Sequence, residues 1–118
     1  MGAGAVVAMS VEATELVLFV DSDEPSYRQK MSISRALARR MDRGTYKGAL
    51  APRAFAALLN LAAKKYIQQH RSPDNKWSQV FSPIDRRAAA LILVDHFEDW
   101  YATDYQSLKR PPTAGGTT

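Results

Sequence analysis

The sequence predicts an all-α protein with three main helices, and three observations support this. Apolar residues recur at the spacing of one helix face, helix start and stop signals flank those segments, and one segment is apolar all round. We expect the helices over about residues 25–43, 52–70 and 83–106. Short connections would join them into a small orthogonal or bundle-like domain.

Length and composition are those of a single folded domain. The chain has 118 residues, of which 46% are hydrophobic and 24% charged, enough to bury one core. We expect one helical domain over residues 10–108, between a disordered N-terminus (1–9) and a disordered Pro/Gly/Thr tail (109–118). No apolar run approaches the ~20 residues that cross a bilayer, so we expect no membrane association. The absence of cysteine excludes disulfides and thiolate sites and fits a reducing, cytoplasmic compartment.

The segment VEATELVLFV, residues 11–20, has two readings. Ser10 could cap a short helix, whereas LVLFV could equally be a buried strand. A lone strand would have no partner elsewhere in the sequence. We therefore favour a short N-terminal helix or an extended lead-in.

The helix expected over 25–43 has clear boundaries. Asp23 or Ser26 can cap it, Pro25 suits the first turn, and Gly44 can adopt the left-handed stop. One side collects apolar and small residues, namely Tyr27, Met31, Ile33, Ser34, Leu37, Ala38 and Met41. The opposite side collects Arg28, Arg35, Arg39 and Arg43.

The helix expected over 52–70 begins at Pro52 and is also amphipathic. Its apolar stripe consists of Phe55, Leu58, Leu59, Ala62, Tyr66 and His70. In the linker that follows, Trp77, Val80 and Phe81 are spaced i, i+3, i+4. We expect this linker to pack into the core.

The helix expected over 83–106 has the clearest start. Ser82 is the predicted N-cap, Pro83 takes the first helical position, and Asp85 completes a capping box. The run AAALILV, residues 88–94, is apolar all round. A helix without a polar face for two turns is typically buried on several sides, so we expect this helix to be central.

Charge is segregated along the chain. Residues 1–24 carry five acids and no base, residues 25–94 carry fourteen bases and three acids, and residues 95–118 carry four acids and two bases. The three segments thus have formal charges of −5, +11 and −2, within a net charge of +4. This asymmetry indicates either an anionic partner for the middle segment or acidic ends folded against it.

The basic residues of the middle segment form the leading candidate site. Arginines on successive turns of one helix face suit phosphate binding, since each guanidinium offers planar paired donors. The predicted nucleic-acid-binding residues are Arg28, Arg35, Arg39, Arg40, Arg43, Lys47 and Arg53. The alternative is an ordinary solvated helix face, although only Asp42 interrupts the positive charge. Nothing here resembles a base-reading helix, so binding would be electrostatic, to nucleic acid or an acidic protein.

Arg86 and Arg87 lie in the first turn of the last predicted helix, where the helix dipole disfavours cations. Either they pair with an acid of the N-terminal segment (Asp21, Asp23 or Glu24) or they face an external anion. We favour the pairing.

The aromatic end of the last helix is a second candidate site. Trp100, Tyr101 and Tyr105 could anchor a protein partner, which would make the chain an inhibitor, adaptor or phage structural component. The alternative, which we favour, is a closing minicore in which Trp77 and Phe81 cover Trp100. We also keep open a homo-oligomer in which acidic ends dock onto the basic face of a second copy.

Catalysis is not indicated. Asp95 and Asp99 at i,i+4, with His96 between them, are the nearest approach to a metal site, but they match no known ligand spacing. There is no nucleophile motif and no glycine-rich phosphate loop. We therefore expect a non-enzymatic protein with no catalytic residues, no metal and no cofactor.

The order YRQK, RGTYKGALAPRAFAALLNLAAKKYI and FSPIDRRAAALILVDHF resembles short all-helical proteins of bacteriophages and mobile elements. The resemblance covers roughly residues 15–101 and includes no catalytic signature. It implies a compact helical domain and a mobile-element context, and no activity.

Overall fold

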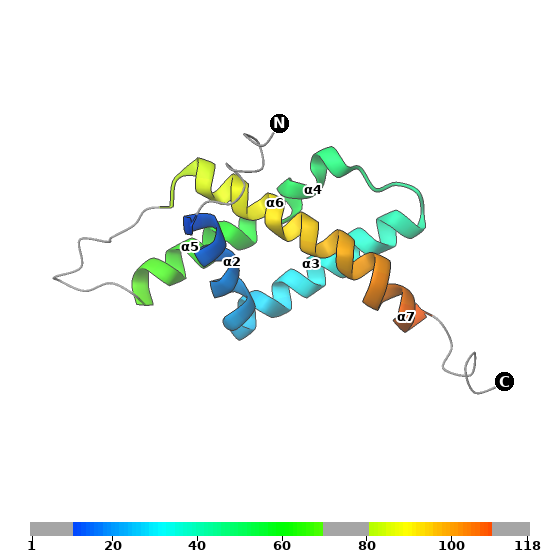
Figure 1. Cartoon of the computed structure of the whole chain (residues 1–118), viewed down its shortest axis with the longest axis horizontal. Helices are drawn as coiled ribbons and strands as arrows, with labels where there is room; N and C mark the ends of the chain where they lie inside the picture. The colour runs from blue at the N-terminus through cyan, green and yellow to red at the C-terminus, as the bar shows by residue number, and fades with distance from the viewer. Residues whose placement is uncertain (1–10, 70–80, 110–118) are drawn as a thin grey trace.

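The computed structural model describes residues 11–69 and 81–109, and in these residues it contains helices and no strand (Figure 1). The all-α prediction is confirmed. The long helices are α2 (Val11–Ser22), α3 (Glu24–Asp42), α5 (Ala56–Gln69) and α6 (Pro83–Trp100). The short ones are η1 (Gly48–Leu50), α4 (Ala51–Ala54), η2 (Tyr101–Tyr105) and α7 (Gln106–Lys109). The predicted disordered ends lie outside the described residues, except for Lys109 at the end of α7.

The prediction of three main helices is wrong, because α2 is a fourth. Of the two alternatives for this segment, a short helix or an extended lead-in, the helix is the one that forms. It packs against α3, α5 and α6. Ala13, Leu16, Val17 and Val20 are all buried, and their spacing of three, four and seven residues places them on one helix face. The compact run LVLFV hides this pattern, because the exposed Leu18 falls inside it.

Helix α3 has the predicted boundaries but not all of the predicted buried face. Its N-cap Asp23 accepts a hydrogen bond from the Ser26 N–H, and Gly44 adopts the left-handed conformation with φ of 74°. The predicted burial of Tyr27 is wrong, since Tyr27 is 44% exposed. Lys30 is buried instead, because its ammonium group reaches Asp21 at the end of α2, 2.7 Å away.

The helix predicted over 52–70 is interrupted. Helix α4 ends at Ala54, and α5 begins at Ala56. The N–H of Phe55 bonds to the carbonyl oxygen of Pro52 at 3.2 Å, a tighter i→i−3 turn that ends α4. Phe55 itself is fully buried, so the interruption inserts a large ring into the core. His70 lies outside the described residues.

Helix α6 begins as predicted, with a complete capping box between Ser82 and Asp85. It packs against α2, α4 and α5, which agrees with a central position. The run 88–94 is apolar all round but keeps one exposed position, since Leu91 is 43% exposed, whereas Leu93 is buried. The preceding linker enters the core through Phe81, which is 1% exposed. Trp77 and Val80 lie outside the described residues.

One cluster of buried side chains draws on every long helix of the described residues. Figure 1 shows α6 running along the helical body into η2 and α7, with α4 beside it. The chain between α3 and α4 therefore turns back at one side of α6. This turn positions the candidate site.

Candidate anion-binding groove

The predicted arginine stripe on α3 is mostly a solvated face. Arg28 forms an ion pair with Glu24, one turn away, and both side chains are highly exposed. Arg35, Arg39 and Arg43 are exposed, and they form no ion pair with any other described residue. The stripe supplies positive charge, but none of its four arginines lines either of the two pockets described below.

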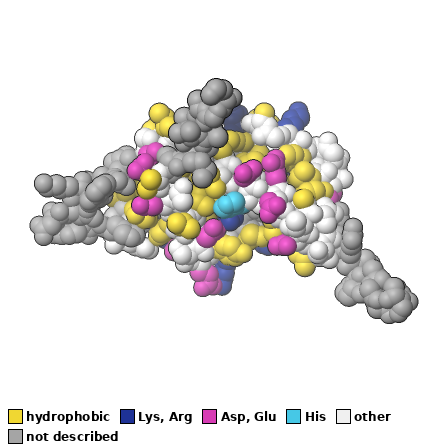
Figure 2. Space-filling model, in the orientation of Figure 1, with side chains coloured by type: hydrophobic (Ala, Val, Ile, Leu, Met, Phe, Trp, Pro, Cys, Tyr) yellow, Lys and Arg dark blue, Asp and Glu magenta, His cyan; other side chains and the backbone are white. Residues whose placement is uncertain are grey.

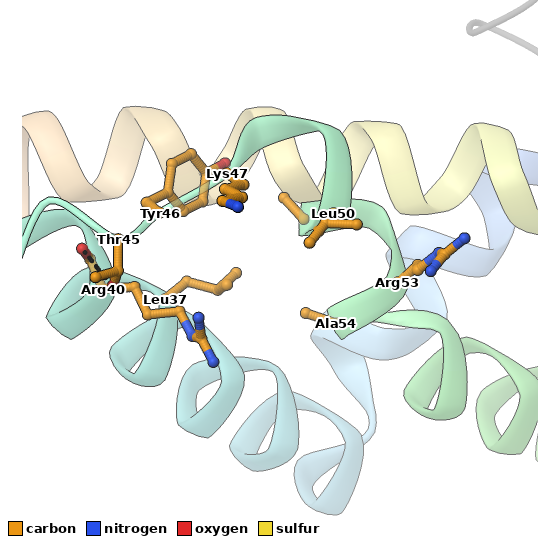
Figure 3. A pocket seen from close by; sticks show the side chains of 9 residues that line it. Leu37, Arg40, Thr45, Tyr46, Lys47, Leu50, Arg53 and Ala54 are labelled. Carbon is orange, nitrogen blue, oxygen red and sulfur yellow. Dashed lines mark hydrogen bonds between the residues drawn. The ribbon is translucent and has the colours of Figure 1, made fainter.

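The other three predicted basic residues meet at a pocket of about 470 Å³. Arg40 comes from α3, Lys47 from the connection after it, and Arg53 from α4. All three are exposed, and none is ion-paired within residues 11–69 and 81–109. Residues from three segments thus line one hollow, with Arg53 at its margin, where its side chain extends away from Arg40 and Lys47 (Figure 3).

The floor of this pocket is apolar. Figure 3 shows the side chains of Leu37, Leu50 and Ala54 around the open middle, with Tyr46 beside Lys47. Leu50 is 51% exposed, so its apolar side chain is accessible beside the cationic rim. The site therefore combines an apolar floor with a positively charged edge.

Tyr46 is fixed in place by α6. Its hydroxyl donates a hydrogen bond to Glu98 at 3.2 Å, and its ring lies 5.7 Å from the ring of Phe97. Burial, and then the nearby Glu98 carboxylate, raise the pKa of Tyr46 to about 12. Tyr46 therefore stays neutral at physiological pH.

A second pocket of about 350 Å³ shares Arg53 with the first. Arg86 and Arg87, from the first turns of α6, complete its cationic rim. Its floor is apolar and includes Pro52 and the buried Leu59 and Ala90. We call the two pockets together the basic groove, defined by Arg40, Lys47, Arg53, Arg86 and Arg87.

The expected pairing of Arg86 and Arg87 with the N-terminal acids does not form, because those acids hold other cations. Asp21 pairs with Lys30, Asp23 with Lys65, and Glu24 with Arg28. Arg86 donates to the carbonyl oxygen of Phe81, and Arg87 is exposed with no ion pair among the described residues. These two arginines were missing from the predicted site, although their disfavoured place at a helix start was a usable signal.

Neither pocket of the basic groove is lined by a described acidic residue. Exposed acids lie instead along α6, at Asp95, Glu98 and Asp99. Figure 2 shows acidic side chains gathered with a histidine on one face, with one basic side chain beside the histidine and other lysine and arginine side chains toward the edges. The charge segregation of the sequence is thus kept between α6 and the groove, whereas Asp21, Asp23 and Glu24 of the acidic N-terminal segment pair with bases of the middle segment.

The predicted protein-interface residues form an aromatic clasp, which we define as Trp100, Tyr101, Tyr105 and Asp42. The Tyr101 and Tyr105 hydroxyls donate to the Asp42 carboxylate at 2.7 and 3.0 Å, and their rings stack 5.3 Å apart. Trp100 lies 5.2 Å from the Tyr105 ring. The clasp ties η2 to the end of α3, which favours the minicore reading, while an interface here stays a prediction.

The cover predicted for this minicore is wrong for Phe81. Its ring partner is Tyr66, at 5.2 Å, near the opposite end of α6. Trp77 lies outside the described residues.

Two further observations bear on other functions. Among residues 11–69 and 81–109, no group of three or more histidine, aspartate or glutamate side chains could hold a metal ion. In the same part of the chain, no helix is both long and apolar enough to span a bilayer.

Comparison with protein families, with curated proteins and with solved structures found no match to this chain. The resemblance to short phage proteins therefore stays a prediction.

Proposed function

We propose that this protein is a non-enzymatic nucleic-acid-binding domain that holds the phosphate backbone in the basic groove. One observation carries the proposal: Arg40, Lys47 and Arg53 come from three segments and line one pocket, and none of them has an ion pair among the described residues. Charges held around a hollow suit a polyanion better than charges on a helix face, because several can contact one ligand.

The arrangement separates two roles for the basic residues. The groove would make direct phosphate contacts, whereas Arg35 and Arg39 on α3 and Arg43 at its C-cap would attract the polyanion from a distance. Direct contacts release counterions, so each lost contact lowers the slope of log affinity against log salt by about 0.7 to 0.9. Distant charges change that slope less.

A matched pair of triple variants tests this division. One carries Arg40→Gln, Lys47→Gln and Arg53→Gln, and the other carries Arg35→Gln, Arg39→Gln and Arg43→Gln. Both remove three positive charges from exposed positions, so a general charge effect would be equal in the two. Affinity for labelled DNA and RNA would be measured at several salt concentrations, and folding would be checked by circular dichroism.

We expect the groove triple variant to lower the salt slope by about 2, and the α3 triple variant by less than about 1. Equal effects would mean that no groove site exists and that binding is diffuse. An absence of binding by the unaltered protein, even at about 50 mM salt, would refute the proposal. Polyglutamate that competes as well as nucleic acid would point to an acidic protein as the partner.

A further inference from the structure

We propose that the basic groove selects unpaired over double-stranded nucleic acid by receiving bases on its two apolar floors. The inference rests on the proposed function and adds the class of ligand. Phosphate contacts alone do not need an apolar surface. Both pockets nevertheless have one, between cations at their edges.

The first pocket has the composition of a base site. Leu37, Tyr46 and Leu50 line it together, and about 470 Å³ lies within the range of pockets that hold small organic ligands. A base in a duplex is stacked between its neighbours and presents only its edges. A base in a single strand can turn outward and place its flat face on apolar or aromatic side chains.

The second pocket repeats the pattern. Leu59 and Ala90 form part of its floor, and Arg86 and Arg87 lie at its edge. Arg53 lines both pockets, and Figure 3 shows its side chain extending from α4 away from Arg40 and Lys47. A strand with one base in each pocket would place a connecting phosphate near Arg53.

Duplex DNA fits the same groove poorly. Its phosphates could reach the edge cations, but its stacked bases could not reach the floors, so the apolar surface would contribute nothing. The apolar contacts would then distinguish the two forms. Stacking of a base on an aromatic side chain, which Tyr46 would supply in the first pocket, changes affinity by roughly 5- to 150-fold per base.

The first experiment compares three labelled probes with the full chain. They are a single strand of about 16 nucleotides, the duplex of the same sequence, and an abasic strand with the same number of phosphates. We expect the single strand to bind at least about tenfold more tightly than either of the others. Affinities within about twofold for all three would overturn the inference and leave the proposed function standing. No binding of any probe would refute both.

A matched pair of leucine variants locates the contribution of the bases. Leu50 in the first pocket and Leu61 on α5 are 51% and 52% exposed, and Leu61 lines neither pocket. We expect Leu50→Asn to weaken single-strand binding by about tenfold, leaving abasic binding unchanged, and Leu61→Asn to change neither. Equal losses for the single and abasic strands with Leu50→Asn would place the bases outside this pocket.

Discussion

The basic groove and the aromatic clasp lie near the two ends of the connection between α3 and α4, but they differ in whether their polar groups have partners within the protein. In the clasp, two tyrosine hydroxyls donate to one carboxylate, and three rings pack against each other. In the groove, Arg40, Lys47 and Arg53 have no ion-pair partner among the described residues.

This difference distinguishes a structural cluster from a binding surface. Polar groups that satisfy each other inside a chain contribute to its stability, and their removal costs folding free energy. Exposed cations held apart around a hollow contribute little to stability, and their removal affects the ligand instead. We therefore expect variants of the clasp to change stability and variants of the groove to change binding.

The largest expected effect is at Phe97, which joins the two regions. It is 1% exposed, and its ring lies 5.7 Å from Tyr46 at the groove and 6.3 Å from Trp100 in the clasp. We expect Phe97→Ala to lower the free energy of unfolding by about 3–5 kcal/mol, because a buried ring leaves a cavity. Urea unfolding measures this loss.

Two variants provide the controls for Phe97. Leu91→Ala, on the same helix but 43% exposed, should cost less than about 1 kcal/mol. Phe97→Leu keeps most of the volume, so it would still fold and allow binding to be measured if Phe97→Ala is too unstable. A loss for Phe97→Ala no greater than that for Leu91→Ala would show that Phe97 does not join the two regions.

A smaller effect is expected at Asp42, which accepts both tyrosine hydroxyls of the clasp. Asp42→Ala should lower the free energy of unfolding by about 1–2 kcal/mol, because two hydrogen bonds to a charged acceptor are lost. Asp99→Ala is the matched control, since it removes an exposed carboxylate from the end of α6. Nucleic-acid affinity should be the same in the two variants. A stability loss shared equally by both would argue against the clasp.

The helices could be predicted where their boundaries have local chemical signals. Ser82 and Asp85 specify the start of α6, and Gly44 marks the end of α3, because caps depend on a few neighbouring residues. The sequence does not decide between a helix and a strand for the residues of α2, because LVLFV suits either one locally. Packing against three other helices selects the helix, and that information is not local.

The sequence predicted which basic residues belong to the site, with the exception of Arg86 and Arg87, but not how they are arranged in space. Helical spacing correctly placed three arginines of α3 and its C-cap Arg43 on an exposed face, but it could not bring Arg40 together with Lys47 and Arg53. Their common pocket depends on the chain between α3 and α4, which turns after Gly44 and passes through η1. The burial of Lys30 was missed for a related reason, since its partner Asp21 belongs to another helix.

The smallest expected effect is at Tyr46. This residue lines the groove and contacts Phe97 and Glu98 of α6, the helix that leads into the clasp. Tyr46→Phe removes one exposed hydrogen bond, to Glu98, and should lower the free energy of unfolding by about 0.5 kcal/mol at pH 7. The ring remains on Phe97, so the apolar floor and single-strand binding should be preserved. A large loss of binding would instead mean that the hydroxyl contacts the ligand.

The pH dependence sharpens this last prediction. The folded protein raises the pKa of Tyr46 from 10.0 to about 12, so the unfolded chain loses this proton first as pH rises. The stabilising contribution is therefore complete below pH 10 and is lost between about pH 10 and 12. Over that interval the unaltered protein should lose stability more steeply than Tyr46→Phe, as measured by urea unfolding at successive pH values. Parallel curves would show that the hydroxyl is free in solution, and the wall of the groove would then be less firmly tied to α6.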